Sequence, residues 1–193
     1  MRLVGWIALL FAAGVAAQDS KKQAPKKLAV PAEWGVGAAV AEFSCPDTAG
    51  KNRTLGELAS DRKALVLAFT AVDCPVAKLY RPKLERLEKD YRKRGVAFAY
   101  VYALAADKPD AAGVEFPVLH DKSGALGKQL KATRTTDVFV IDGAKVLRYR
   151  GAVDDQYGLG YSNEKAVENF LVDALEAVLK GADVAVKATE APG

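Results

Sequence analysis

The chain has 193 residues, of which 50% are hydrophobic and 27% are charged, and its formal net charge is +4 at pH 7. This composition is typical of a soluble globular domain, and the length suffices for one hydrophobic core rather than two. The small positive charge does not provide the basic surface of nucleic-acid-binding proteins. We therefore expect one folded domain and no nucleic-acid partner.

The first 17 residues have the pattern of a secretory signal peptide. Arg2 gives a positive start, Leu3 to Val15 is mainly apolar, and small residues lead up to Ala17. The apolar stretch is shorter than the roughly 20 residues that a membrane-spanning helix needs. The sequence predicts cleavage after Ala17, export to the periplasm or the extracellular medium, and no stable membrane insertion after cleavage.

The rest of the chain divides into three parts by composition. Residues 18–33 are rich in lysine and contain Pro25, which predicts a flexible linker. Residues 34–186 carry the apolar stretches of a folded domain. Residues 187–193 are predicted to form a loose tail.

The stretch Ala64 to Gly95 predicts a buried strand followed by a long helix. Ala64 to Ala71 is apolar apart from one threonine, which is typical of a strand covered on both faces. Asp73, Cys74 and Pro75 follow, and proline is favoured at the first position of a helix. Cys74 is therefore expected at or next to the N-cap, where free backbone N–H groups stabilise a thiolate.

The helix that follows is predicted to be amphipathic and to carry two cations near the thiol. Lys78 and Arg81 come four and seven residues after Cys74, so helical spacing places all three on one face. The cations and the helix dipole favour the thiolate, whereas Asp73 opposes it. The apolar stripe of the helix consists of Val76, Leu79, Tyr80, Leu84, Leu87 and Tyr91.

The order of five segments resembles that of the thioredoxin-fold redoxins. They are Cys-Pro-x-x-Lys at the helix start, KRGVAFAYV, FPVLHD, VFVID and VLRYRGAVDDQYG. The resemblance covers roughly Val36 to Thr189 and is closest to the peroxiredoxin-like group of the alkyl hydroperoxide reductase and thiol-specific antioxidant class. It implies an α/β, thioredoxin-like fold: a central mixed β-sheet flanked by helices, with an N-terminal β-hairpin extension. The strands at residues 64–71 and 96–102 should be neighbours at the sheet centre.

The resemblance also implies which residues surround the thiol. Thr136 occupies the place of a cis-proline that faces the active cysteine, and Arg134 a position at which some relatives carry a second cysteine. Arg150 and Asp154 close the last strand, so they either line the site or belong to a charged surface loop. The catalytic candidates are Cys74, Lys78, Arg81 and Thr136, and the pocket candidates are Thr70, Asp73, Pro75, Arg134, Arg150 and Asp154.

Several signature residues of these families are missing. The peroxiredoxin motif Pro-x-x-x-Thr-x-x-Cys would need proline and threonine where this chain has Leu67 and Ala71. Ala77 stands where the second cysteine of a thioredoxin Cys-x-x-Cys motif would be. The match therefore predicts the fold more specifically than the reaction.

Cys45 and His120 have simple structural interpretations. Cys45 is either a small buried side chain or a resolving cysteine that forms a disulfide with Cys74. His120 is a lone histidine, which we interpret as a structural side chain. We therefore predict no metal site and no cofactor.

Two functions from different classes remain open. The first is an exported thiol-dependent oxidoreductase, peroxidase-like, in which Cys74 reduces a peroxide or another small oxidised substrate and an external thiol restores it. The second is a catalytically degenerate thioredoxin-fold binding or scaffold protein. Only Ala103 to Glu115 connects two expected parallel strands, and this short crossover leaves room for a partner, either a second copy of the chain or an envelope protein.

Overall fold

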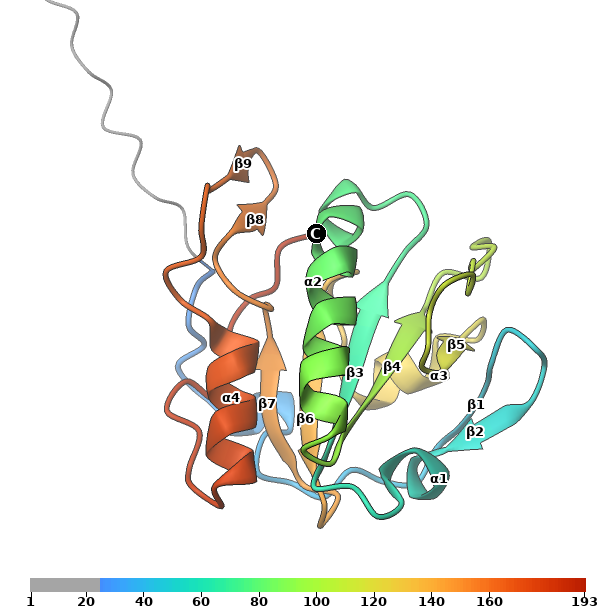
Figure 1. Cartoon of the computed structure of the whole chain (residues 1–193), viewed down its shortest axis with the longest axis horizontal. Coiled ribbons are helices and arrows are strands. Elements are labelled where there is room, and N and C mark those ends of the chain that lie inside the picture. Colours follow the sequence, from blue (N-terminus) through green and yellow to red (C-terminus); the bar gives the residue numbers. More distant parts are fainter. Residues whose placement is uncertain (1–24) are drawn as a thin grey trace, which may run out of the picture.

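The computed structural model describes residues 25–193 (Figure 1). The predicted signal peptide and residues 18–24 of the predicted linker lie outside this range. A search of the described residues for a helix long and apolar enough to cross a membrane finds none.

A five-stranded mixed sheet forms the centre of the molecule, in the order β5-β4-β3-β6-β7 (Figure 1). Its strands are β3 (Ala64–Thr70), β4 (Val96–Tyr102), β5 (Val118–His120), β6 (Val138–Asp142) and β7 (Leu147–Gly151). β4 runs parallel to β3 and β5, whereas β6 is antiparallel to β3 and β7. The predicted central pair β3–β4 is confirmed, because neither strand lies at an edge.

Helices cover both faces of the sheet (Figure 1). They are the 3-10 helix η1 (Pro31–Trp34), α1 (Leu55–Ala59), α2 (Pro75–Arg92), α3 (Ala125–Gln129) and α4 (Phe170–Leu179). Val66 and Ala68 of β3 pack with α2 and α4, while Leu65, Leu67 and Phe69 pack with α1 and α3 on the other face. The continuous apolar pattern of β3 thus reflects burial on both sides.

Two short hairpins extend this core. The N-terminal hairpin joins β1 (Ser44–Pro46) and β2 (Asn52–Thr54), and the second joins β8 (Tyr157–Gly158) and β9 (Tyr161–Ser162). Asp47 closes the first turn, because its carboxylate accepts hydrogen bonds from the backbone N–H groups of Ala49 and Lys51, each at 2.9 Å. The N-terminal hairpin extension predicted from the sequence is confirmed.

Three local features differ from what the sequence pattern indicates. Ser162 and Asn163 are residue types that favour a helix N-cap, yet the last helix begins at Phe170, because the intervening residues form β9 and an irregular segment. Leu79 is 49% exposed and so lies outside the apolar stripe of α2. The β4–β5 crossover contains no helix, and Phe116 packs against the rings of Phe98 and Tyr100 there instead.

The C-terminal segment is packed, which corrects the prediction of a loose tail. Thr189 is fully buried, and its Oγ1 forms hydrogen bonds with the Tyr149 hydroxyl (2.9 Å) and the Ala152 N–H (2.8 Å). Gly151 makes this contact possible, since its φ is +133° and a Cβ there would lie 2.2 Å from Thr189 Oγ1. The tail is therefore docked beside β7.

The predicted linker is also packed where the structure describes it. The Leu28 N–H donates to the Ala188 carbonyl at 2.9 Å, and the Glu190 N–H donates to the Lys26 carbonyl at 2.8 Å. On the other side of the C-terminal tail, the Thr189 N–H donates to the Arg150 carbonyl at 3.1 Å. The tail thus lies between β7 and the N-terminal segment, with backbone hydrogen bonds to both.

Candidate functional site

Cys74 is the N-cap of α2, as the sequence predicts. Its Sγ accepts a hydrogen bond from the Ala77 N–H at 3.4 Å, Pro75 is the first residue of the helix, and the Lys78 N–H donates to the Cys74 carbonyl at 3.1 Å. The thiol is half-buried, whereas Asp73 is exposed. A backbone donor and the positive end of the dipole of an 18-residue helix therefore face the sulfur, an arrangement that favours negative charge there.

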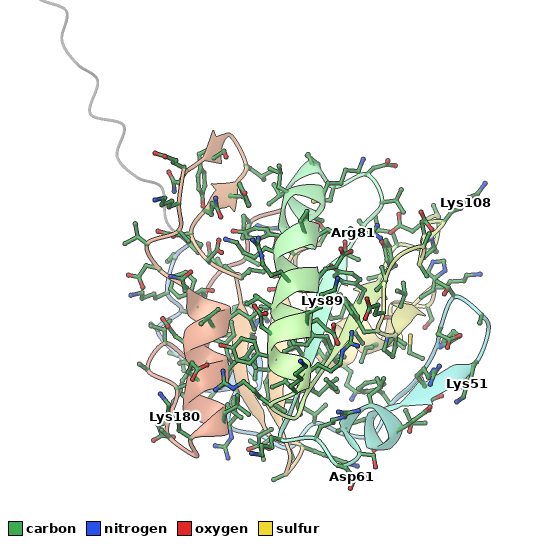
Figure 2. The ribbon with its side chains drawn as sticks, in the orientation of Figure 1. Lys51, Asp61, Arg81, Lys89, Lys108 and Lys180 are labelled. Atoms are coloured by element: carbon green, nitrogen blue, oxygen red, sulfur yellow. The ribbon has the colours of Figure 1, made fainter. Side chains whose placement is uncertain are left out.

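The two predicted cations have different settings. Lys78 is exposed and forms no ion pair with the described residues. Arg81 points to the crossover after β4 (Figure 2): its Nε lies 2.8 Å from Glu85 Oε1, and its Nη2 donates to the Ala112 carbonyl at 3.4 Å. The hydrogen bond to Glu85 raises the pKa of Arg81. Arg81 is thus bound to Glu85 and to the Ala112 carbonyl. This corrects the expectation that both cations stabilise the Cys74 thiolate.

Thr136 lies opposite the first turn of α2. It lines a cavity of about 10 Å³ together with Thr70, Ala77 and Tyr80, and its buried Oγ1 has no hydrogen-bond partner. The tail approaches from outside, because a Cβ added at Gly193 would lie 3.0 Å from this oxygen. The structure therefore brings Thr70 and Thr136 together beside the residue that donates to Cys74.

Asp137 holds the loop that carries Thr136. Its Oδ2 accepts hydrogen bonds from the backbone N–H groups of Thr133 (2.7 Å) and Arg134 (3.1 Å), and both of its oxygens lie 2.9 Å from Arg150 Nη2. Asp137 and Arg150 are 0% and 1% exposed. This chain has Thr136 in the place where thioredoxin-like relatives carry a cis-proline. The buried ion pair between Asp137 and Arg150 holds the loop here.

Arg150 is neither a pocket wall nor part of a surface loop, which corrects both interpretations of the sequence. Its guanidinium lies over the rings of Trp34 (4.8 Å to the centroid) and Phe139 (5.3 Å), and its Nη1 donates to the Lys131 carbonyl at 2.8 Å. A planar cation with several fixed donors suits such a site, where a lysine would not. Arg150 therefore has a structural role beneath the loop.

Asp154 is likewise an internal anchor. Its Oδ1 accepts a hydrogen bond from the Tyr80 hydroxyl at 2.8 Å, and its Oδ2 pairs with Lys83 of α2. Burial and then the charge of Asp154 raise the pKa of Tyr80. These contacts tie the centre of α2 to the segment after β7. Sequence reasoning missed Lys83, because nothing in the local pattern relates it to a residue 71 positions away.

Cys45 is buried and unpaired. It is 2% exposed and belongs to the core cluster of the α1/α3 face, while Cys74 packs against the cluster on the α2/α4 face. Burial, followed by the charge of Asp121, raises the pKa of the Cys45 thiol to about 12. The structure thus supports the buried interpretation of Cys45 and contradicts the resolving role.

His120 has a structural partner. Its Nε2 lies 3.2 Å from the Leu104 carbonyl, and the side chain is buried at the end of β5. Among the residues that the structure describes, no group of three or more histidine, cysteine, aspartate or glutamate side chains is placed to hold a metal ion.

Comparison with known proteins agrees with this geometry. The sequence profile of the family described as Redoxin matches residues 35–171. The chain belongs to the redoxin family. A search of curated proteins gives no match. Family membership together with a cysteine at the N-cap of α2 supports a redoxin-type thiol oxidoreductase function.

Solved structures similar to this redoxin include proteins of several bacteria. A hypothetical protein, SMc02350, from Sinorhizobium meliloti 1021 is 30% identical, with a TM-score of 0.71 over 86% of this chain and 94% of that chain. Peroxidoxin BcpB from Mycobacterium tuberculosis is 23% identical, with a TM-score of 0.57 over 76% and 97% of the two chains. A putative thiol:disulfide interchange protein DsbE from Chlorobium tepidum is 18% identical, with a TM-score of 0.60 over 75% and 97%. The last two likenesses show the fold alone.

Proposed function

We propose that this redoxin is a one-cysteine thiol oxidoreductase that reduces a peroxide or another small oxidised substrate. The observation that carries the proposal is the half-buried Sγ of Cys74 at the helix N-cap, where it accepts the Ala77 N–H. A thiolate is the nucleophile in such reactions, and a helix N-terminus favours it. We also propose that the protein is exported to the periplasm or the extracellular medium. The signal-peptide pattern of the first 17 residues supports this location.

With a hydroperoxide, the cycle consists of one oxidation and one reduction, and the reduction uses two external thiols. The Cys74 thiolate attacks the outer peroxide oxygen, the O–O bond breaks, and the leaving alkoxide takes a proton, which gives cysteine sulfenic acid and an alcohol. An external thiol then attacks the sulfenic sulfur and releases water, and a second external thiol breaks the mixed disulfide. Cys45 is unsuited to either step, because its thiol is buried and its pKa is raised to about 12.

The test uses the full chain with Cys74→Ser and, as a matched control, Cys45→Ala. Consumption of hydrogen peroxide and of an organic hydroperoxide is measured with dithiothreitol as the reductant, and sulfenic acid is trapped for mass spectrometry. We expect Cys74→Ser to lose at least about 100-fold in rate and all trapped sulfenic acid, while Cys45→Ala stays within about twofold. Equal rates for Cys74→Ser and the unchanged protein would overturn the proposal and favour a binding or scaffold protein.

A further inference from the structure

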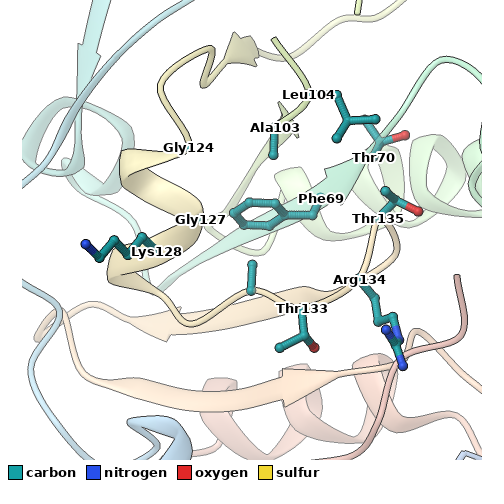
Figure 3. A pocket seen from close by; sticks show the side chains of 11 residues that line it. Phe69, Thr70, Ala103, Leu104, Gly124, Gly127, Lys128, Thr133, Arg134 and Thr135 are labelled. Carbon is teal, nitrogen blue, oxygen red and sulfur yellow. The ribbon is translucent and has the colours of Figure 1, made fainter. Parts of the chain in front are cut away.

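We propose that a pocket on the α3 side of the sheet binds a small organic anion with an apolar body, such as a medium-chain carboxylate. The pocket lies between α3, the end of β3 and the loop before β6, and its volume is about 270 Å³ (Figure 3). Cys74 is not among its lining residues. The pocket shares Thr70 with the small cavity beside Ala77, so it is a neighbouring site, and the proposed ligand goes beyond the thiol chemistry.

The body of the pocket is apolar. Phe69 forms its centre (Figure 3), and Leu104 forms one wall although it is 49% exposed. Phe69 itself is buried (3% exposed), and Gly127 of α3 lies along the edge of its ring, where a Cβ would lie 3.5 Å from Phe69 Cε1. An apolar ligand would cover the exposed surface of Leu104, which is a favourable change of roughly 25 cal/mol for each Å² removed from water.

The rim of the pocket is cationic. Lys128 and Arg134 lie on opposite sides of Phe69, and their charged heads reach away from the ring to the margin (Figure 3). Neither forms an ion pair with the described residues, and none of the residues that line the pocket is acidic. An anionic group at either margin would therefore meet one of two free cations, while its apolar chain lies inside.

The volume sets the size of the ligand. One water molecule takes about 30 Å³ in the liquid, so 270 Å³ corresponds to about nine waters, or a ligand of about ten non-hydrogen atoms. Octanoate has this size and combines a carboxylate with an apolar chain. The hydroxyls of Thr70 and Thr135 also line the pocket and offer donors to the same group.

The experiment measures binding by titration calorimetry on the full chain, with three probes. Octanoate has both features, 1-octanol has the chain alone, and inorganic phosphate has the charge alone. We expect saturable binding of octanoate, weaker binding of octanol, and no binding of phosphate. Absence of saturable octanoate binding, or saturable binding of phosphate alone, would overturn the proposal.

Variants separate the two parts of the site. The double change Lys128→Gln and Arg134→Gln should raise the Kd of octanoate about three- to tenfold and leave the Kd of octanol unchanged. The control is Arg86→Gln, which removes an exposed cation of α2 outside the pocket and should change neither Kd. Leu104 is exposed, so a polar residue there should not disturb the fold. Leu104→Ser should weaken the binding of octanoate and of octanol to the same extent. Equal octanoate affinity in all variants would contradict the proposal that octanoate binds in this pocket.

A final variant distinguishes this proposal from the proposed function. Cys74→Ser should bind octanoate with unchanged affinity even where it has lost peroxide reduction. Binding without peroxide reduction in the unchanged protein would sink only the proposed function. Peroxide reduction without octanoate binding would sink only the second site.

Discussion

The two cysteines of this redoxin occupy opposite settings on the two faces of one sheet. Cys74 ends a loop, caps α2 and faces a backbone donor, whereas Cys45 lies in the core beside β5 with 2% of its surface exposed. The same side chain is thus placed once where a negative charge is stabilised and once where burial opposes it. Position in the fold, rather than residue type, decides which thiol can react.

The largest expected difference is in alkylation. Treated with iodoacetamide at pH 8, the native protein should be modified at Cys74 at least about 100 times faster than at Cys45, because burial raises the pKa of Cys45 to about 12 and blocks access. Peptide mass spectrometry over time measures both rates. In denaturant the two rates should converge; similar rates in the native protein would contradict the comparison.

The loop opposite the first turn of α2 is held by a buried ion pair that lies on the Cys45 face of the sheet, where Arg150 packs on Phe139. Asp137→Asn leaves Arg150 buried without its charge partner, so the free energy of unfolding should fall by about 3–5 kcal/mol. Glu85→Gln removes the half-exposed partner of Arg81 and should cost less than about 1 kcal/mol. Urea unfolding compares the two, and similar losses would show that the loop does not depend on Asp137.

The core setting of Cys45 should also produce a pH dependence. Its pKa is raised to about 12 in the folded state, above the value of about 8.5 for a free thiol, so the folded protein binds more protons between these values. The thiol's contribution to stability is therefore complete below about pH 8.5 and is lost as the pH rises toward 12.

Cys45→Ala tests this through thermal unfolding at several pH values. The variant should be about 1 kcal/mol less stable at pH 7, because it leaves a small cavity, and its stability should fall less steeply between pH 9 and 11. If the stability of the two proteins fell equally between pH 9 and 11, Cys45 would not be a group that titrates on unfolding.

The smallest effect concerns the two cations of α2. Lys78→Gln should slow alkylation of Cys74 by up to about threefold, since one exposed charge contributes a few tenths of a kcal/mol. Arg81→Gln should change the rate less, because Arg81 is bound to Glu85 and the Ala112 carbonyl. A larger effect from Arg81 would mean that it reaches the thiol in solution.

Local pattern was enough to predict the elements around the thiol. The apolar run of β3 and the proline after Cys74 are short-range signals, and each led to the right element. The burial of Cys45 followed from the general preference of that residue type. The family resemblance then supplied the central mixed sheet, and the central pair β3–β4 was predicted correctly.

Contacts between distant segments could not be predicted in the same way. Arg150 near the end of β7 and Asp154 after it were predicted either to line the site or to belong to a charged surface loop, yet each is buried and pairs with a residue that only the folded chain brings close. The tail is polar and small in sequence, but a missing Cβ at Gly151 gives Thr189 a buried site. Such effects depend on space left by other residues, which periodicity does not reveal.

The docking of the tail has a consequence for chain connectivity. Lys26 and Glu190 are hydrogen-bonded neighbours, so a short linker could join the two ends of the described chain without moving the sheet. Opening such a circular permutant in the helix-free crossover between β4 and β5 should keep every strand pairing. The contacts between the N-terminal segment and the tail, such as that of Lys27 with Thr189, would become local, whereas β4 and β5 would come to lie at opposite ends of the chain, so the pairing of these two strands would then close the longest loop.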